Sequence, residues 1–424
     1  MNRMNIFFSR IIVFIAAVCS LVCGCTSGGA QETPLPKNTP QITPAPVPTE
    51  AVSEFPTCTA PAITDAPNHD TDSETVLTAE QISVMNAAFL QFPGESAGLF
   101  DLASFKNGIS AKRLKALIAQ GNLPSANGYV GQTPLSAQQR NEILNNRALD
   151  AVQGHSDVRF GFCVQRSDLR SVPFAPRVTS KPNDRFGDTL QESVVLQNEP
   201  LAVLHESADG KFLFVAAYFY VGWINSDSVA LCSSFEQWQA LLAPENDFLV
   251  VTGSSFRLCR DPYEPLVSEL ELTMGMRLSL AEKPGTVKSV RGRMSYDNYI
   301  VNVPSRAADG SLKFIEALVP ISRDVHIGYL PFTYSNVIRL ADKTRGEIYG
   351  WGGMLDARDC SALVMEIYRC FGIMLPRNTS DLAKLPEKYA ADVSSLSAEA
   401  KRETILSQPA GVILFLSRTR YDLL

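Results

Sequence analysis

One cysteine late in the chain has the setting of a nucleophile. Cys360 follows Asp359 directly and opens a run whose apolar residues recur at helical spacing up to Phe371, with Gly372 as a stop signal. A thiol in the first turn of a helix faces the positive end of the helix dipole and free backbone N–H groups, which favour the nucleophilic thiolate. Asp359 is placed to cap that helix. Cys370 lacks such flanks, and we expect it to pack in the core.

Distinctive segments lie on both sides of this helix. The segment before it reads Tyr349-Gly350-Trp351-Gly352-Gly353, and its glycines allow the main chain to approach a ligand closely. The segment after it reads Leu375-Pro376-Arg377-Asn378-Thr379-Ser380. With Asp359-Cys360-Ser361 between them, the order and spacing over residues 340–382 resemble the NlpC-type cell-wall cysteine peptidases.

The resemblance implies a reduced papain-like α/β domain without a cofactor. Such a domain hydrolyses the bond between D-γ-glutamate and the diamino acid of peptidoglycan stem peptides, with a cysteine as nucleophile. Cys360 would be that nucleophile, Asp359 and Ser361 would line the substrate pocket, and Tyr349 would border the oxyanion side. Asn378 stands where some relatives carry an aspartate that binds the free amine of the stem peptide. An asparagine keeps a hydrogen-bond acceptor there and loses the charge.

The base that this reaction requires is not visible in the sequence. In the family, a histidine on a later strand takes the thiol proton and returns it to the leaving amine. Residues 410–416 predict the strand that precedes that one, and the sequence ends at residue 424. We therefore expect a peptidase domain that is truncated and inactive as written, through a natural frameshift near residue 416 or a sequence error. All histidines precede Cys360; they are His69, His155, His205 and His326.

The elements ahead of the peptidase segment predict three further units. Residues 77–152 show helical periodicity and predict a small helical domain, with helices near 78–92, 112–119 and 136–149. Residues 153–240 and 241–325 consist of short β runs broken by turns and predict two SH3-like barrels.

The first barrel carries the stronger signal. A Tyr and a Gly-Trp pair within residues 214–224 resemble the closing strands of bacterial SH3 domains. We expect Tyr220 of this unit to close the substrate pocket. The fold class is thus multidomain: a small α-helical domain, two SH3-like β-barrels and an incomplete papain-like α/β (α+β) peptidase domain over 326–424. This arrangement resembles one branch of the family.

The N-terminal residues predict a targeting signal. Residues 1–25 contain Arg3, Arg10 and a short apolar core, as in a secretion signal. The ending Val22-Cys23-Gly24-Cys25 resembles a lipobox with Cys25 as the lipidated residue; the alternative is an ordinary cleaved signal. Residues 26–76, rich in Pro and Thr, predict a disordered linker. We expect an extracytoplasmic, membrane-anchored lipoprotein facing the cell wall.

The bulk composition excludes several other classes. The chain of 424 residues has a formal net charge of −6, and its basic residues are not clustered, so we expect no nucleic-acid partner. Its nine cysteines are irregularly spaced without a CxxC pair, so we expect no metal site and no disulfide framework. The leading function is a peptidoglycan endopeptidase whose partners are stem peptides and, through Cys25, the membrane. The alternatives are a non-catalytic wall-binding lipoprotein that uses the SH3-like domains, and a purely structural wall lipoprotein.

Overall fold

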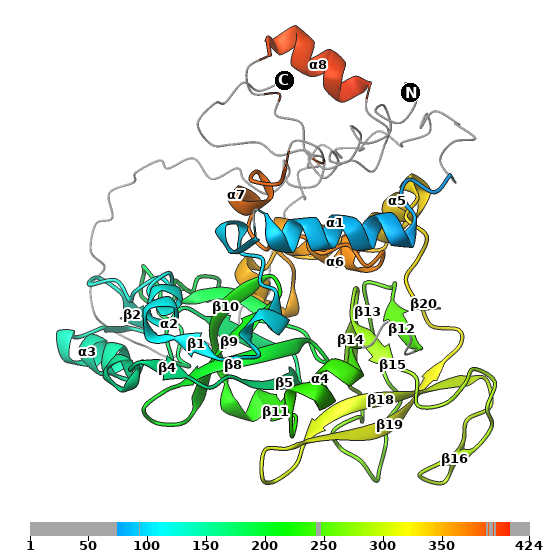
Figure 1. Ribbon diagram of the computed structural model, residues 1–424, viewed down its shortest axis with the longest axis horizontal. Coiled ribbons are helices and arrows are strands. Elements are labelled where there is room, and N and C mark those ends of the chain that lie inside the picture. Colours follow the sequence, from blue (N-terminus) through cyan, green and yellow to red (C-terminus); the bar gives the residue numbers. More distant parts are fainter. Residues whose placement is uncertain are drawn as a thin grey trace, which may run out of the picture.

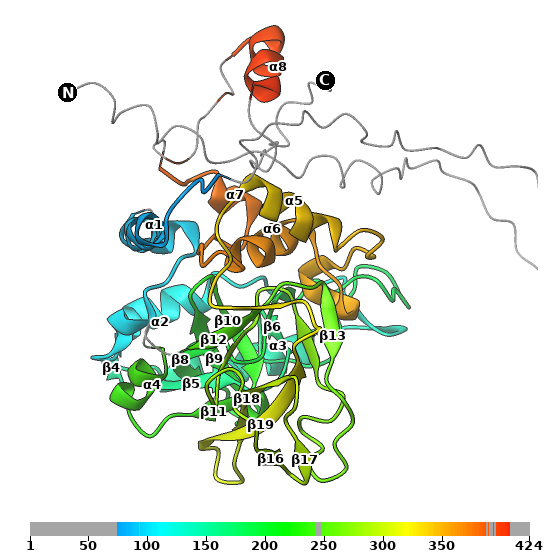
Figure 2. The same ribbon diagram turned by 90° about the vertical axis from the view of Figure 1, so that its right-hand side faces the viewer.

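The structure shows a layer of helices above two β units. It is a computed structural model that describes residues 74–92, 94–242, 247–386, 389, 393 and 396–407. Cys25, the signal segment, the linker up to residue 73 and the strand expected near 410–416 lie outside these residues. Figure 1 and Figure 2 show α1, α5, α6 and α7 on one side, with the strands below them. The strands form two β units, which are called barrel 1 (residues 159–231) and barrel 2 (residues 248–327) after the barrels that the sequence predicts.

The helices of the N-terminal segment form where the sequence predicts them. Helix α1 opens with a complete capping box, in which Thr78 accepts from the backbone N–H of Gln81 and the Gln81 side chain accepts from that of Thr78. Ser136 and Gln139 repeat this arrangement at α3. The elements here are α1 (Ala79–Gln91), α2 (Ala111–Ile118), α3 (Ala137–Asn145), the one-turn helices η3 (Gly94–Ala97), η4 (Leu102–Phe105) and η5 (Leu149–Ala151), and the two-residue pairs β1 (Ile109–Ser110) with β4 (His155–Ser156) and β2 (Tyr129–Val130) with β3 (Thr133–Pro134).

These helices do not share a core. Met85 and Phe89 of α1 pack with side chains of α6, whereas Leu114 of α2 packs against the strands of barrel 1. Ile143 of α3 joins a separate small cluster. A short amphipathic helix is stabilised by the surface that buries its apolar face. Residues 77–152 are therefore helical pieces attached to different neighbours rather than a unit with its own core.

Barrel 1 is an antiparallel sheet in the order β11-β5-β8-β9-β10-β6-β7. Trp223 lies fully buried in its core, where it stacks edge-on to His205. Gly222 is required by close packing, because a Cβ there would lie 2.8 Å from Leu169 Cγ. The elements are β5 (Arg159–Cys163), β6 (Ser167–Arg170), β7 (Gln191–Val195), β8 (Pro200–Glu206), β9 (Phe212–Ala217), β10 (Tyr220–Asn225), η6 (Ser226–Ser228), β11 (Val229–Leu231) and the flanking α4 (Phe235–Leu241).

Barrel 2 is built on the sheet β15-β12-β20 and the long hairpin β18-β19. Val194 and Leu196 from barrel 1 lie in its hydrophobic core, so the two barrels are packed together. The elements are β12 (Phe248–Val251), β13 (Ser255–Arg257), β14 (Glu271–Thr273), β15 (Arg277–Ser279), β16 (Ser289–Val290), β17 (Arg293–Met294), β18 (Asn298–Arg306), β19 (Leu312–Pro320) and β20 (Val325–Ile327).

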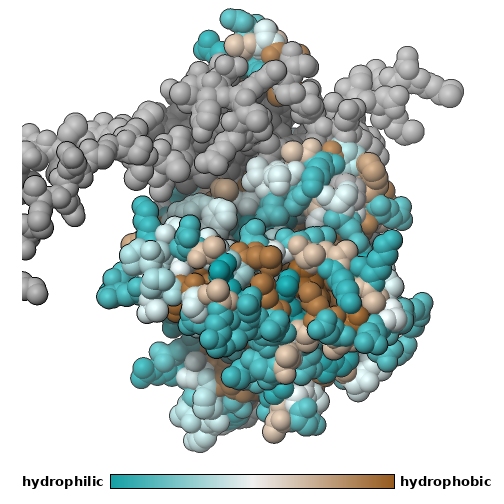
Figure 3. Space-filling view, turned by 90° about the vertical axis from the view of Figure 1, so that its left-hand side faces the viewer, coloured by the Kyte–Doolittle hydropathy of each residue, from teal (hydrophilic) through white to brown (hydrophobic). Residues whose placement is uncertain are grey.

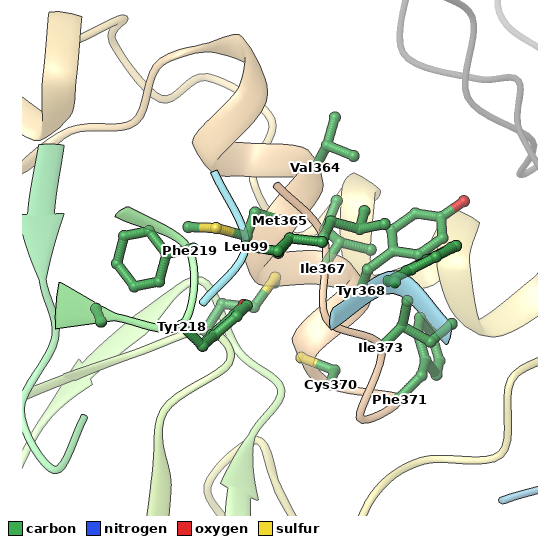
Figure 4. Close-up of a cluster of buried hydrophobic side chains, with 14 of the residues drawn as sticks. Leu99, Tyr218, Phe219, Val364, Met365, Ile367, Tyr368, Cys370, Phe371 and Ile373 are labelled. Carbon is green, nitrogen blue, oxygen red and sulfur yellow. The ribbon is translucent and has the colours of Figure 1, made fainter. Parts of the chain in front are cut away.

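The C-terminal segment is helical where it is described. Ile367 and Tyr368 of α6, and Phe371 just after it, are almost completely buried, and Figure 4 shows them in one hydrophobic cluster with Leu99 and Phe219 from distant parts of the chain. Burial of each such side chain contributes about 1.5–3 kcal/mol, so α6 is held by its neighbours as much as by its own hydrogen bonds. The elements are α5 (Tyr334–Asp342), η7 (Trp351–Asp356), α6 (Cys360–Arg369), α7 (Thr379–Leu382) and α8 (Ala398–Leu406).

The surface is not uniformly polar. Figure 3 views the side on the left of Figure 1, where apolar residues gather in a band across the middle of the face and hydrophilic residues surround them. A search of the described residues for a helix long and apolar enough to cross a membrane finds none.

Candidate active site at the start of α6

Cys360 is the first residue of α6, as the sequence predicts, and it is half-buried. Asp359 caps the helix: its Oδ1 accepts from the N–H of Ala362 at 2.9 Å. Its Oδ2 accepts from the N–H of Gly352 at 3.0 Å. One carboxylate therefore fixes both the helix that carries the thiol and the glycine-rich loop in front of it.

A buried arginine holds this carboxylate. Arg377 is 3% exposed and donates to both oxygens of Asp359, at 3.0 and 2.5 Å. It also donates to Ser361 Oγ at 2.8 Å and, through Nε, to Ser193 Oγ on β7 at 2.7 Å. A bidentate arginine–carboxylate pair with further partners is the arrangement in which a buried ion pair is satisfied. Asp359 and Ser361 are thus occupied by internal contacts, and their contact with substrate stays a prediction.

The glycine-rich loop lies against barrel 1. Gly352 and Gly353 have φ of 58° and 84°. A Cβ on Gly353 would lie 2.6 Å from Val194 Cγ1, and one on Gly352 would lie 2.8 Å from Gln191 Cγ. The side chain of Gln191 donates to the carbonyl of Gly352 at 2.9 Å. The sequence predicts a close main-chain approach here, but the approached surface is β7 rather than a ligand, because the barrel fills the space on that side.

Exposed apolar side chains lie in the loop that precedes Cys360. Tyr349 is 43% and Trp351 57% exposed. The N–H of Gly350 donates to the carbonyl of Arg358, and Tyr349 forms a bridge pair with the same residue. Tyr349 therefore lies beside the main chain two residues before Cys360, which is compatible with its predicted role. Large exposed apolar groups gathered in one place mark surfaces that contact a ligand or partner.

The opposite side of the site is formed by barrel 1 and the start of α7. The hydroxyl of Tyr220 donates to Glu192 Oε2 at 2.7 Å. Burial, then the negative charge of Glu192, raise the pKa of Tyr220, while the amide of Asn378 and the charge of Arg377 act in the other direction. Tyr220 is thus a neutral phenol. The structure brings together Tyr220 and Asn378, which the sequence analysis named separately.

Several residues of the site were missed by the sequence analysis. Glu192 and Ser193 lie on β7, in a run predicted only as strand, and no local signal marks them. Arg166 donates to the carbonyl of Gly353 at 2.5 Å and to Asp356 at 2.9 Å, which fastens the loop from barrel 1. Arg377 was visible in the Leu-Pro-Arg-Asn-Thr-Ser segment, yet its role depends on partners that only the fold supplies.

No described histidine is placed to serve Cys360. His155 and His205 contact the main-chain carbonyls of Asn107 and Arg147. His326 pairs with Val250 on β12, and the next residue, Val251, accepts from the thiol of Cys370. Cys370 follows the C-terminal end of α6, about 15 Å from Cys360 along a ten-residue helix. His326 therefore lies at the wrong end of α6.

The other cysteines of the described residues carry no comparable site. All five cysteines of the described residues, Cys360 included, are free, and Cys370 is fully buried, as predicted. Burial raises the pKa of Cys370 and of Cys163 to about 12. Within the same residues, no group of three or more His, Cys, Asp and Glu side chains is arranged to hold a metal ion.

Comparison with known proteins places this site in a family. The model of the NlpC/P60 family matches residues 346–412, and that of the SH3 domain (SH3b1 type) matches residues 180–225. A search of curated proteins found no match.

Two solved structures are similar to the chain. The first is described as a novel NlpC/P60 endopeptidase from Photobacterium damselae subsp. piscicida. It is 18% identical with a TM-score of 0.55, and the alignment covers 73% of this chain and 66% of that one. The second, NlpC2 from Trichomonas vaginalis, is 12% identical, with 57% of this chain and 76% of that chain covered, but its TM-score is 0.20. The chain thus spans just under two thirds of the Photobacterium protein, and that likeness shows a shared fold.

The fold and the site define a thiol peptidase domain joined to an SH3-type β unit. Residues 346–412 form a domain of the NlpC/P60 family, a family of cysteine peptidases of the hydrolase class. The predicted family and the multidomain fold class are confirmed, and the SH3 match falls on barrel 1.

Proposed function

We propose that this chain is a peptidoglycan endopeptidase that acts on the D-γ-glutamyl–diamino acid bond of stem peptides. The observation that carries the proposal is the position of Cys360. Its thiol stands at the N-terminal end of α6, which Asp359 caps, directly after a loop that carries exposed aromatic side chains. The positive end of the helix and its first free N–H groups stabilise a negative charge that develops here during the reaction.

The polar side of the site fits the free amine of a stem peptide. Asn378 lacks the charge that an ammonium group attracts. Glu192 supplies a carboxylate nearby, held by the hydroxyl of Tyr220 at 2.7 Å and by Asn122 at 3.0 Å. A charge-assisted hydrogen bond to an ammonium group is stronger than a neutral one. We propose that Glu192, with Tyr220 and Asn378, binds the amine, and that Tyr349 lies on the oxyanion side.

The base remains the missing part of the reaction. The sequence holds no histidine after Cys360, and His326 lies near the far end of α6. Without a base, the thiol proton is not taken up and the leaving amine is not protonated. We therefore propose that these 424 residues bind stem peptides without turning them over, and that hydrolysis requires a continuation that carries the histidine.

Hydrolysis assays on two chains test the proposal. One is the 424-residue chain; the other is a chain continued in the reading frame that supplies a histidine after residue 416. The substrate is L-Ala-γ-D-Glu-diaminopimelate, with product amine measured by chromatography. We expect turnover only by the second chain, and its loss in the Cys360→Ala variant. Turnover by the 424-residue chain that Cys360→Ala abolishes would disprove the missing base, and no turnover by either would disprove the peptidase assignment.

A second candidate function follows from the absence of a base beside Cys360 in the described residues. The chain would then be a non-catalytic wall-binding lipoprotein that uses its SH3-like units. Because α1, barrel 1 and α6 share one core, a fragment without the peptidase segment is a poor test. Sedimentation of the full chain with purified peptidoglycan, compared with a Glu192→Gln variant, is a better one. Binding that Glu192→Gln leaves unchanged would favour this second function.

We also propose that the protein is held at the extracytoplasmic side of a membrane through a lipid on Cys25. The support is the basic, apolar and small-residue order of residues 1–25. Metabolic labelling with a radioactive fatty acid tests it. We expect label in the natural chain and none in Cys25→Ser.

A further inference from the structure

A cavity of about 430 Å³ lies at the end of α6 opposite Cys360. It is formed where the chain's units meet, because Leu90 of α1, Trp238 of α4, Arg277 of β15 and Arg369 of α6 all line it. Its volume falls in the range of small-molecule sites, which is about 300–1,000 Å³. Cys360, Asp359 and the glycine-rich loop are not among its lining residues, so it is separate from the candidate active site.

The interior of this cavity carries a net positive charge. Arg369 is buried and pairs with Glu199 at 3.0 Å. Arg277 forms no ion pair within the described residues, and its guanidinium lies 4.0 Å from the ring centroid of Phe248. Asp101, at the rim, is exposed to solvent and uses its carboxylate to cap η4. The interior therefore holds two guanidinium groups and one carboxylate.

Polar atoms without a partner gather in the same walls. Across the described residues, the buried side-chain atoms that lack a hydrogen bond include Gln197 Oε1, Trp238 Nε1, Arg277 Nε and Arg369 Nη2. All these residues line the cavity. Buried polar groups are nearly always hydrogen-bonded, and a buried polar group without a hydrogen bond costs free energy. Of these atoms, the ones on Trp238, Arg277 and Arg369 are donors, and they belong to residues that line the cavity.

Most of the remaining wall is apolar and includes several aromatic rings, although Asn198, Gln239 and Ser279 also line it. Phe100 and Tyr218 are contributed from the barrel 1 side, and Phe248, Phe314 and Tyr329 from the barrel 2 side. Such a surface accepts a flat or branched hydrocarbon body and disfavours a second charge, because an unpaired buried charge is costly.

We propose that this cavity binds a small organic monoanion, in which one carboxylate is attached to an apolar, preferably aromatic, body. The carboxylate meets the guanidinium groups of Arg277 and Arg369, and the body lies among the aromatic rings. Arginine suits this task because its planar fork binds both carboxylate oxygens. The site is independent of the proposed peptidase reaction.

Calorimetric titration of the full chain with 2-naphthoate tests the site. The uncharged probe 2-naphthylmethanol has the same ring body and lacks the carboxylate. We expect saturable binding of one 2-naphthoate per chain and at least tenfold weaker binding of the alcohol. Cys360→Ala should bind 2-naphthoate with unchanged affinity.

Three variants locate the binding. Arg277→Met removes the charge and keeps the apolar stem, and Ala103→Trp fills the cavity from an exposed rim position. We expect each to weaken 2-naphthoate binding at least tenfold. Arg323→Met is the matched control, because Arg323 also lies over a ring of barrel 2, that of Phe256, but does not line the cavity. It should leave the affinity within twofold.

The outcomes decide the proposal even where one variant folds poorly. Absence of saturable binding, equal affinity for the two probes, or binding that Ala103→Trp does not change would each overturn it. Ala103 is exposed, so its substitution does not disturb a core.

Discussion

The two ends of α6 carry the same residue types and differ in nearly everything else. At the N-terminal end, Cys360 is half-buried and its neighbour Asp359 pairs with the buried Arg377. At the C-terminal end, Cys370 is fully buried and its neighbour Arg369 pairs with Glu199. Each end thus has one thiol and one buried arginine–carboxylate pair.

The difference lies in what surrounds each thiol. Cys360 meets the positive end of a helix beside exposed aromatic side chains, which is where a nucleophile can form and meet a substrate. Cys370 donates to the carbonyl of Val251 at 3.4 Å, and burial raises its pKa to about 12, so it stays a thiol at neutral pH. The comparison teaches that a cysteine's reactivity depends on its place along a helix and on exposure.

The largest expected effect is the difference in catalytic activity between variants of the two cysteines. In a chain that carries the histidine, Cys360→Ala should reduce stem-peptide hydrolysis by on the order of 10⁶-fold, the cost of losing a catalytic nucleophile. Cys370→Ala, the control, should leave kcat/KM within about twofold, because the sulfur only packs. Initial rates by chromatography give both values. A large loss of kcat/KM in Cys370→Ala would break the comparison.

Substitution of the two buried arginines should reduce the stability of the protein by different amounts. Arg377→Met leaves Asp359 buried without its bidentate partner, and breaking such a pair costs about 3–5 kcal/mol of unfolding free energy. Arg369→Met should cost less, because Glu199 keeps the attraction of Arg277 and burial already raises its pKa, so that it can take up a proton. Urea denaturation of the two variants measures the difference. Equal costs would show that the two pairs are equivalent.

The close packing of the loop before Cys360 can be tested with two glycines of the same φ. Gly353 and Gly346 both have φ of 84°, but only at Gly353 would a Cβ meet another side chain, Val194 at 2.6 Å. Gly346→Ala should cost about 1 kcal/mol for backbone strain alone. Gly353→Ala should cost about 1–3 kcal/mol more and slow the alkylation of Cys360, since the loop must move from barrel 1. Equal losses of stability in the two variants would show that the loop does not pack against barrel 1.

The smallest effect concerns the dependence of stability on pH at the buried end. The pKa of Cys370 lies near 9.0 in the unfolded chain and at about 12 in the fold. Because the folded value is the higher one, its contribution is complete below pH 9 and decreases as the pH rises toward 12. Tm measured from pH 8 to 11 should therefore fall more steeply for the natural chain than for Cys370→Ala. Parallel curves would show that the thiol ionises equally in both states.

Local patterns predicted the elements that depend on local physics. The capping box at Thr78, the helix from Cys360 and its end near Gly372 follow from side-chain hydrogen bonds and apolar periodicity within about 15 residues. The family resemblance followed from the same segment, and so did the proposed nucleophile, since the thiol's setting is a property of one helix terminus. The buried, inert state of Cys370 was also predicted from its flanks.

Other features depend on contacts between segments far apart in the sequence. Glu192 and Ser193 look like any strand residues until β7 lies against Arg377 and Tyr220, and the glycines before Cys360 reveal their partner only when barrel 1 is in place. The helices of residues 77–152 follow the same rule, because each buries its apolar face on a surface that another unit supplies. The sequence by itself determined which residue is the candidate nucleophile, because one helix turn sets its chemistry. The tertiary structure alone decided which charges surround it and where a second cavity opens, because these arise from side chains brought together across more than a hundred residues.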